Sequence, residues 1–322
     1  MKAITTRQYG TPDVLTLEDI AQPNPKSKEL LIKVSASAVT SGDARIRGLN
    51  VPFGFKFITR LLFGFNKPKQ PVLGTVFSGV VAATGNEVTE FKEGDEVFGA
   101  SNNFGSHAEY VVVPESGPIA IKPANCSFNE AAAIPFGALT SLKYLRDFGK
   151  IKAGEKILIN GASGALGVYG VQLAKYFGAH VTGMCSTANV SLVKSLGADA
   201  VIDYTTTDFT KNGEAYDIIY DTVGKITFSQ SKKSLTKNGR LLLAAAGLPQ
   251  YFQVLSTSLF SKKKVIAGVA VFNKKDIAVI KELVSSGKLR SVIGKQFPLS
   301  ETKEAHIYVD TGHKVASAVI TM

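Results

Sequence analysis

Short apolar runs, interrupted by turn residues, characterise the first 120 or so residues of the chain. Glycine, proline and charged residues separate these runs at short intervals, as in antiparallel sheets. The segment 50–70 differs, because its five phenylalanines and several lysines and arginines fit neither the helical nor the strand period. We expect a helical or mobile insertion beside a pocket there. Elsewhere the pattern predicts an antiparallel, partly closed β-structure with strands in 29–39, 74–85, 93–99 and 106–114.

From about residue 125 onward, strand-like and helix-like segments alternate. The first is a predicted helix over 127–149, with Asn125 or Ser127 as its N-cap and Glu130 at a capping-box position. Short apolar strands that alternate with amphipathic helices are typical of a parallel, doubly wound sheet. We expect strands at 156–160, 180–185, 200–204, 216–224, 239–247 and 264–271, and helices at 164–177, 189–196 and 226–236. The pattern is mixed again in the tail, with helices at 274–286 and 301–310 and a final strand at 316–322.

A glycine-rich turn, GASGALG at 161–167, lies between the strand 156–160 and the helix that follows it. Gly161 allows a tight turn, Gly164 lets a pyrophosphate approach the backbone, and Gly167 lets the helix pack closely on the sheet. The helix N-terminus then offers free N–H groups and a partial positive charge to the phosphates. Because a strand, a helix and further αβ units surround the three glycines, they predict a dinucleotide-binding domain rather than a purely structural turn.

The end of the strand at 180–185 indicates which dinucleotide is bound. NAD-selective proteins usually place an aspartate or a glutamate there to hold the ribose hydroxyls. The loop in this chain has no acid and reads Ser186, Thr187, Ala188 and Asn189. Hydroxyl, amide and N–H groups can hold a 2′-phosphate, so the loop favours NADP(H) over NAD(H), although it contains no arginine or lysine.

The charge balance changes this interpretation little. Lysine and arginine number 37 against 26 acids, and the formal charge of +11 attracts phosphates, nucleic acids or anionic lipid surfaces. The lysines form small clusters without the spacing of an RRM, a helix-turn-helix or a zinc finger. We therefore expect a solvated basic surface and no nucleic-acid partner, with weak attraction to a membrane surface as the main alternative.

Neither a targeting segment nor a membrane span is predicted. The apolar segments are too short to cross a bilayer, and the N-terminus begins directly with a strand-like pattern. The two cysteines, Cys126 and Cys185, form neither a disulfide framework nor a cluster of metal ligands. We expect a cytoplasmic protein in a reducing compartment, with no integral membrane association.

Several motifs together resemble the medium-chain dehydrogenase/reductase superfamily. They are YGTPDVLTLEDI near the N-terminus, AAAIPFGALTSL, INGASGALG, VTGMCSTAN, SLGADAVIDY and YDIIYDTVG. The resemblance extends over nearly the whole chain. Within the superfamily it points to the zinc-free quinone oxidoreductase branch, which includes zeta-crystallin and the chloroplast envelope quinone oxidoreductase homologue.

This resemblance implies an α/β fold with two domains. A GroES-like, β-rich catalytic domain would comprise 1–124 and 270–322, and an inserted Rossmann domain that binds NADP(H) would comprise 125–269. The active site would be the cleft between them. Relatives pair through an edge strand of the Rossmann sheet, so the resemblance also implies a homodimer, with 264–271 as the candidate edge.

Zinc alcohol dehydrogenases of the superfamily hold a catalytic zinc ion with residues that this chain lacks. The resemblance places Thr40, Thr75 and Phe136 at their three ligand positions, and no four-cysteine lobe follows Gly99. Hydroxyl and phenyl groups do not form a zinc site. We therefore expect no metal site and no metal-activated alcohol oxidation.

Without zinc, the implied chemistry is direct hydride delivery from NADPH to a quinone or an α,β-unsaturated carbonyl, whose oxygen takes up the developing negative charge. The protein must orient the reactants and supply a donor or a proton to that oxygen. Relatives often carry asparagine at the position of Thr40, so Thr40 is the candidate catalytic residue; the alternative is a strand threonine bonded to the backbone. Asp43 is expected to hold the cleft wall together, and His107 to lie at the surface or in a turn.

The resemblance also implies the contacts with the cofactor. Ser163, Ala165 and Leu166 would surround the pyrophosphate, and Tyr204 would lie near the 2′-phosphate unless it is an ordinary strand-end residue. The predicted cofactor-binding residues are Thr140, Gly161, Ser163, Gly164, Ala165, Leu166, Gly167, Ser186, Thr187, Asn189, Tyr204, Val223, Ala246, Gly247, Val269 and Val271.

Two other functions stay open. The same hydride step in another pocket would make the protein an enoyl-thioester or alkenal reductase. The basic charge and the phenylalanines from Phe53 to Phe65 would also suit an NADPH-binding protein of low turnover that acts at a membrane surface or through a partner.

The chain departs from its relatives at two places. Val76 stands in place of an acid, and Ala316-Ser317 stands in place of Gly-Lys. These departures affect details of catalysis rather than the fold.

Overall fold

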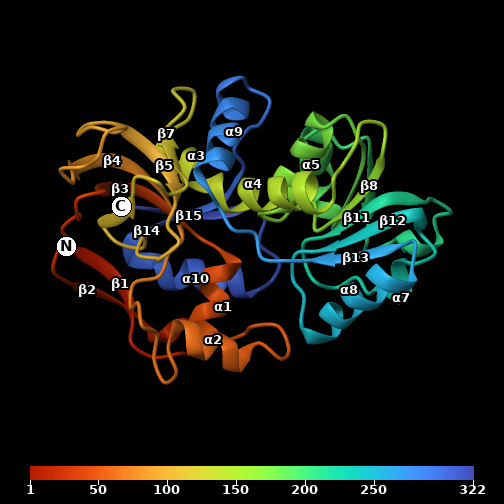
Figure 1. Ribbon diagram of the computed structural model, residues 1–322, viewed down its shortest axis with the longest axis horizontal. Coiled ribbons are helices and arrows are strands. Elements are labelled where there is room, and N and C mark those ends of the chain that lie inside the picture. The colour runs from red at the N-terminus through yellow and green to blue at the C-terminus, as the bar shows by residue number, and fades with distance from the viewer. The chain divides into compact units, whose positions relative to one another are not determined.

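The computed structural model describes residues 1–322 and divides them into two compact units, which we describe separately (Figure 1). Unit 1 is rich in β-structure and comprises Met1–Val51, Lys56–Leu139 and Phe272–Met322. Unit 2 contains the alternating strands and helices and comprises Pro52–Phe55 and Thr140–Val271. None of the helices is both long enough and apolar enough to cross a lipid bilayer.

The boundary between the units differs from the predicted one. The sequence pattern changes at about residue 125, but residues up to Leu139 belong to unit 1. The reason is the packing of helix α3 (Phe128–Ala133), which lies against strands of the unit 1 sheet. Its Ala132 and Ala133 are buried in the core of that unit. Helical periodicity marks where a helix begins, but it does not say which sheet the helix covers.

Unit 1 contains a seven-stranded sheet in the order β14-β15-β3-β4-β5-β7, with β6 paired to β3. The pairs are antiparallel except for β14 and β15, so the predicted antiparallel structure is confirmed. A separate hairpin of β1 and β2 completes the unit. The strands are β1 (Lys2–Thr6), β2 (Leu15–Asp19), β3 (Glu29–Val39), β4 (Val76–Thr84), β5 (Glu96–Ala100), β6 (Tyr110–Pro114), β7 (Ile119–Ile121), β14 (Ile293–Pro298) and β15 (Ser317–Thr321).

The predicted helix over 127–149 is interrupted. Ser127 caps it with Glu130 in a capping box, as predicted. Pro135, which has no N–H to continue the ladder, ends α3 and begins α4 (Pro135–Leu142), and a π-helical turn, Lys143–Phe148, follows. The other helices of unit 1 are α1 (Ser41–Gly48), α2 (Lys56–Phe63), α9 (Lys274–Ser285) and α10 (Thr302–Asp310).

Unit 2 is a six-stranded parallel sheet in the order β10-β9-β8-β11-β12-β13, as predicted. Figure 1 shows α5 and α8 on opposite faces of this sheet, as a doubly wound fold requires. Its strands are β8 (Lys156–Asn160), β9 (His180–Cys185), β10 (Ala200–Asp203), β11 (Tyr216–Asp221), β12 (Leu235–Leu243) and β13 (Lys264–Ala267). Its α-helices are α5 (Gly167–Tyr176), α6 (Val190–Ser195), α7 (Phe228–Ser231) and α8 (Leu248–Phe260).

Two helices of unit 2 differ from the prediction. The predicted helix over 226–236 is reduced to the single turn of α7, because Leu235 already pairs with Tyr216 and packs in the core as the first residue of β12. Helix α8 has no counterpart among the predicted helices. Its Pro249 interrupts the apolar pattern of the sequence, but it stands in the first turn of the helix, where proline is tolerated.

Candidate active site

The predicted cofactor residues of unit 2 gather at the carboxyl edge of its sheet. The strand order reverses between β8 and β11, and Gly161 follows β8 while Val223 follows β11. Open α/β sheets bind ligands at such a reversal. The other predicted residues follow the neighbouring strands: Ser186, Thr187 and Asn189 follow β9, Tyr204 follows β10, Ala246 and Gly247 follow β12, and Val269 and Val271 follow β13.

The three glycines of the turn differ in how closely protein atoms would approach a side chain placed on them. Gly161 has a φ of +75°, and a Cβ there would lie 2.5 Å from Val223 Cγ2 and 2.6 Å from Thr222 Oγ1. A Cβ on Gly167 would lie 2.6 Å from Ala162 Cα, so the helix could not pack as it does. At Gly164, by contrast, the one neighbour of such a Cβ is Gly161 O at 3.3 Å. Packing within the protein therefore requires Gly161 and Gly167, but it does not require Gly164.

The start of α5 leaves backbone donors free beside Gly164. The helix begins at Gly167, three residues later than predicted, because Gly164 N–H closes a turn onto Gly161 O (2.9 Å). The N–H groups of Ala165, Leu166 and Gly167 donate to no protein acceptor, and no side chain caps the helix. Free N–H groups at a helix N-terminus fit a phosphate. The turn therefore suits the pyrophosphate of a nicotinamide dinucleotide.

Contacts from two other segments hold this turn in place. Ser141, which follows the predicted cofactor residue Thr140 on α4, donates from Oγ to Leu166 O (2.9 Å). The buried Asp221 carboxylate accepts hydrogen bonds from Asn160 Nδ2 (2.9 Å) and from the N–H groups of Val223, Gly224 and Ile226 (2.8–3.0 Å). These bonds fix the chain on both sides of the strand reversal.

An acid lies beside the loop that was predicted to be free of acids. Asp203 ends β10 and pairs with Cys185 at the end of β9. Thr187 Oγ1 donates to Asp203 Oδ2 (2.5 Å), and Thr205 donates to Oδ1 from both its N–H and its hydroxyl. The bonds from Thr187 and Thr205 lower the pKa of Asp203, so it is ionised at neutral pH. The acid is not part of the predicted loop because it belongs to the next strand, β10.

In unit 1, Thr40 and Asp43 form a reciprocal cap on helix α1. Thr40 Oγ1 donates to Asp43 Oδ2 (2.6 Å) and accepts from Asp43 N–H (3.1 Å), and Thr40 N–H donates to the same carboxylate (2.8 Å). Asp43 Oδ1 accepts from Gly74 N–H (3.2 Å), which ties α1 to the segment before β4. Both side chains are buried. The hydroxyl proton of Thr40 is therefore committed to Asp43, and a catalytic role for Thr40 stays a prediction.

Replacing Thr40 with valine should lower the free energy of unfolding by about 1–2 kcal/mol, because the cap loses its side-chain donor and acceptor. Thr40→Ser should keep most of that stability. Urea unfolding of both variants measures the difference. If Thr40 also contacts the acceptor, kcat/KM of the folded valine variant will fall about tenfold while the serine variant stays near wild type; equal stability of the two variants would contradict the capping role.

The positions that hold zinc in zinc alcohol dehydrogenases offer no suitable donor set here. Thr40 Oγ1 and Phe136 Cε2 both lie within 4 Å of a Cβ built on Gly42, so the structure brings these two side chains together. Neither side chain supplies the thiolate or imidazole that zinc takes in this superfamily. Thr75, the third position, has a buried hydroxyl without a hydrogen-bond partner. The residues present do not fit a zinc ion, but Thr75 retains a free hydroxyl.

His107 does not lie at the surface, which corrects the prediction. It is completely buried, its Nδ1 has no partner, and its ring packs edge-on against His306 at 5.7 Å between centroids. Burial lowers the pKa of both imidazoles. Both rings are therefore neutral at physiological pH and form part of the core. The FGSHAEY motif has no apolar periodicity, so it gave no signal of this burial.

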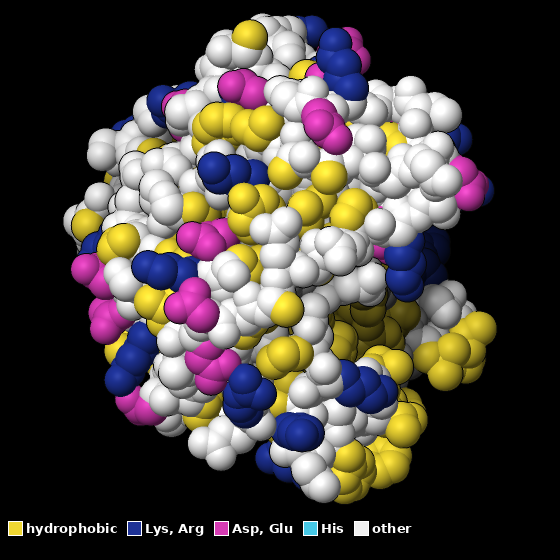
Figure 2. Space-filling model, turned by 90° about the vertical axis from the view of Figure 1, so that its left-hand side faces the viewer, with side chains coloured by type: hydrophobic (Ala, Val, Ile, Leu, Met, Phe, Trp, Pro, Cys, Tyr) yellow, Lys and Arg dark blue, Asp and Glu magenta, His cyan; other side chains and the backbone are white.

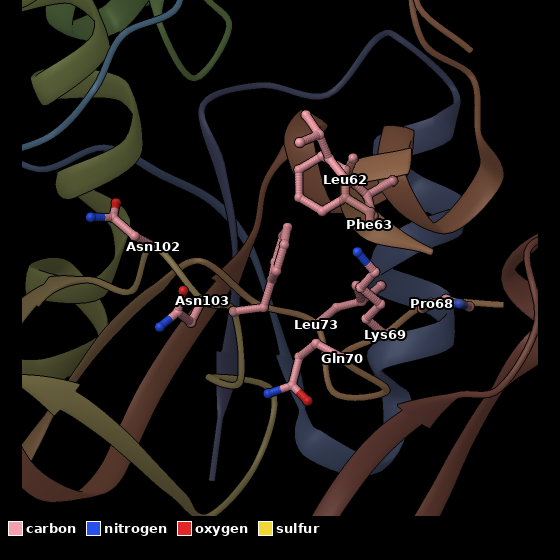
Figure 3. Close-up of a pocket in the computed structure, with 10 residues that line it drawn as sticks. Leu62, Phe63, Pro68, Lys69, Gln70, Leu73, Asn102 and Asn103 are labelled. Atoms are coloured by element: carbon pink, nitrogen blue, oxygen red, sulfur yellow. The ribbon is translucent and has the colours of Figure 1, made fainter. Parts of the chain in front are cut away.

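A cavity of about 350 Å³ opens in unit 1 between α2 and the loop 102–104 (Figure 3). Apolar side chains form much of its wall, and the rings of Phe63 and Phe104 meet edge-on at 5.7 Å. Gln70, Asn102 and Asn103 add side-chain amides. The insertion 50–70 thus lies beside a pocket, as predicted, whereas the contribution of the loop 102–104 was missed. The full lining is Ile46, Leu62, Phe63, Pro68, Lys69, Gln70, Leu73, Asn102, Asn103 and Phe104.

Two protein families match parts of the chain. The zinc-binding dehydrogenase family matches residues 196–320, and the alcohol dehydrogenase GroES-like domain matches residues 26–123. The second match lies within unit 1 except for Pro52–Phe55, which belong to unit 2. The first spans β10 to β15, so it includes part of the sheet of each unit.

Individual relatives match over nearly the full chain. The chloroplastic quinone-oxidoreductase homologue of Spinacia oleracea is 33% identical, over 99% of this chain and 98% of its own. The chloroplastic NADPH-dependent alkenal/one oxidoreductase of Arabidopsis thaliana is 32% identical, over 99% of this chain and 79% of its own. Among solved structures, the quinone oxidoreductase of Coxiella burnetii superposes with a TM-score of 0.87 at 30% identity, covering 100% of this chain and 99% of that one.

Proposed function

Given that this chain belongs to the quinone oxidoreductase branch of the medium-chain dehydrogenase/reductase superfamily, we propose that it reduces quinones or α,β-unsaturated carbonyls with NADPH. The observation that carries the cofactor part is Gly164, a glycine that packing does not require, beside free N–H donors. When bound, the cofactor supplies a hydride. The protein's part is to hold both reactants, to exclude water and to place donors at the acceptor oxygen.

NADP(H) is proposed over NAD(H) for two reasons. The loop after β9 presents Ser186 and Asn189, whose polar groups suit a 2′-phosphate, and Asn189 Nδ2 already donates to Ser186 Oγ (3.0 Å), whereas the Thr187 hydroxyl donates to Asp203. A relative with 32% identity is named as NADPH-dependent. The ionised Asp203 acts against this preference, because its charge repels a phosphate.

The unit 1 cavity is the proposed acceptor site. Its volume suits a small ligand, and its ring faces suit the apolar body of a quinone or an enone. The amides of Gln70, Asn102 and Asn103 are donors for a carbonyl oxygen.

Replacing Phe63 with alanine tests the acceptor site. We expect KM for a quinone or an alkenal to rise about tenfold, because a ring that faces the ligand is lost, and the Kd for NADPH to stay within about twofold. Steady-state kinetics with NADPH and a panel of quinones and alkenals measure the first quantity, and a fluorescence titration measures the second. An unchanged KM for every acceptor of the panel would remove the cavity from the proposal.

A homodimer through β13 is also proposed. This strand is one end of the unit 2 sheet, so one of its sides is unpaired. Thr257 Oγ1 accepts from Val265 N–H (3.0 Å) and blocks the beginning of that side. Beyond the strand, 77% of Val269 and 64% of Val271 is exposed. An exposed edge with apolar side chains is a template for pairing with a second chain.

Val269→Pro should therefore convert a dimer to a monomer, because proline removes an N–H from the exposed segment that continues the edge of β13 and adds steric hindrance. Sedimentation velocity at several concentrations measures the change, and the variant Leu17→Ser, in unit 1, is a control that should stay dimeric. A variant that remains a dimer would show that the copies do not pair through this edge.

The cytoplasmic location stays a prediction, since several relatives are named as chloroplastic.

A further inference from the structure

Helix α2 exposes the side chains that a helix of a globular protein usually buries. Between 46% and 66% of each side chain on one face is exposed, and this face consists of Phe57, Ile58, Leu61 and Leu62. The residue that α2 buries instead is Thr59. Amphipathic helices normally turn the apolar face to the core. The outward face of α2 is therefore suited to a second apolar environment outside the unit.

The chain around this helix contains cations and no acids. Between Asp43 and Glu87 there is no aspartate or glutamate. The cations that flank the exposed face are Lys56, Arg60, Lys67 and Lys69. None of the four forms an ion pair with a carboxylate. Their charges are uncompensated and available to an anionic surface.

Two of these cations, Arg60 and Lys69, contact residues of the apolar face or its border. Lys69 Nζ donates to Leu61 O (3.0 Å), and the Arg60 guanidinium lies 5.7 Å from the centroid of Phe65, which is 55% exposed. Figure 2 shows hydrophobic and basic side chains side by side at the lower right of the molecule, the side to which α2 turns, with no acidic side chain among them. Lysine and arginine that border an apolar face in this way bury their stems and keep their charges in the headgroup layer of a membrane.

We propose that the segment 56–69, with α2 at its centre, docks the protein on an anionic lipid bilayer. Phe57, Ile58, Leu61 and Phe65 insert into the boundary between headgroups and acyl chains, and the cations bind lipid phosphates. A bilayer fits better than a protein groove because the outer face is apolar over two turns and the charged side chains around it, Lys56, Arg60, Lys67 and Lys69, are all cations. The association is peripheral, since α2 has eight residues and cannot span the membrane.

The cavity lies close enough to the docking segment for an acceptor to enter it from the bilayer. Leu62 and Phe63 of α2, together with Lys69, line the cavity in unit 1, so the cavity lies beside the docked segment (Figure 3). An apolar quinone or enone dissolved in the bilayer would then reach its site without crossing water. This consequence depends on the proposed function, whereas the docking itself does not.

Cosedimentation with vesicles tests the docking without any measurement of activity. The probes are vesicles of phosphatidylcholine alone and of phosphatidylcholine mixed with phosphatidylglycerol, at low and at high salt. We expect the full-length protein to bind the anionic vesicles at least about tenfold more strongly than the neutral ones, and to lose most of this difference at high salt. Binding to neither kind of vesicle at low salt would overturn the proposal.

Two pairs of variants locate the surface. Each of two double variants should weaken binding to anionic vesicles about tenfold or more. The first combines Phe57→Ser with Leu61→Ser, and the second combines Lys56→Gln with Lys67→Gln. None of these four residues lines the cavity. The controls are Leu17→Ser with Ile307→Ser, which are 42% and 47% exposed on unit 1, and Lys232→Gln with Lys233→Gln, which remove the same charge elsewhere. The controls should bind as the wild type does.

Three outcomes would overturn the assignment to α2. The first is equal weakening by the test and control variants, which would indicate general charge attraction. The second is unchanged binding by Phe57→Ser with Leu61→Ser. The third is self-association of the wild type that these two substitutions abolish, without vesicle binding, which would show that a second copy covers the face. If the wild-type protein binds vesicles but reduces no quinone with NADPH, the proposed function is contradicted and the docking is not.

Discussion

Replacing Gly164 with valine should weaken NADPH binding by about a hundredfold or more and leave the fold intact, because the side chain would fill the space of the pyrophosphate and not that of the protein. A Cβ at this position has one protein neighbour, Gly161 O at 3.3 Å. The melting temperature without cofactor should therefore stay within a few degrees of the wild-type value. Fluorescence titration with NADPH and thermal unfolding measure the two quantities.

The neighbouring glycines provide the matched controls. Valine at Gly161 or Gly167 should destabilise the protein by about 2–4 kcal/mol, because each Cβ would overlap protein atoms and Gly161 has a positive φ. The three variants thus separate a ligand requirement from a packing requirement. Normal NADPH binding by the Gly164 variant would contradict the assignment of this turn to the pyrophosphate. A large loss of stability in that variant would show that Gly164 is required for packing after all.

Replacing Asp203 with asparagine should strengthen NADPH binding about tenfold and leave NADH binding nearly unchanged, because a negative charge beside the loop 186–189 is removed. The amide is nearly isosteric: its one oxygen can still accept from Thr205 N–H, and its NH2 group takes the place of the oxygen that accepts from Thr187 Oγ1. Hydrogen bonds from Thr187 and Thr205 lower the pKa of this carboxyl, so the charge is present throughout the neutral range. Parallel fluorescence titrations with NADPH and NADH, at low and high salt, measure the change.

Asp208→Asn is the control for this experiment. Asp208 is an exposed acid of unit 2 whose carboxylate also accepts hydrogen bonds from a threonine two residues later, Thr210. Its removal changes the net charge by the same amount, so it should leave the ratio of the two affinities unchanged. If Asp203→Asn instead weakens NADH and leaves NADPH alone, the carboxylate contacts the ribose hydroxyls, and the proposed preference for NADPH is wrong.

The order of elements was predictable because it depends on local pattern. The strand boundaries of β3, β8 and β9 agree with the predicted ones, since buried strands form continuous apolar runs and polar or glycine residues end them. The tight turn at Gly161 and the close helix packing at Gly167 also followed from the motif, because a strand, a tight turn and a helix in succession leave few other geometries. Family membership rests on the same local signals.

The errors come from contacts between distant residues. Asp203 ends β10 and Ser186 follows β9, and only the pairing of β10 with β9 brings the acid beside the loop. The burial of His107 depends on His306 of α10, far away in the sequence. Leu235 became part of a strand because Tyr216 pairs with it, although the local pattern favoured a helix. In each case a non-local partner decided the outcome, and propensity alone does not contain that information.

By itself, then, the sequence determined the parallel sheet of unit 2, the antiparallel sheet of unit 1, the glycine turn and the lack of zinc ligands, because short-range periodicity and residue chemistry are sufficient for these features. Three features were decided by the tertiary structure alone. A Cβ at Gly164 would have one protein neighbour, the Thr40 hydroxyl donates a hydrogen bond to Asp43, and α2 turns its apolar face outward. The physical reason is that an amphipathic pattern specifies a face but not its neighbour. The direction of that face depends on the rest of the fold.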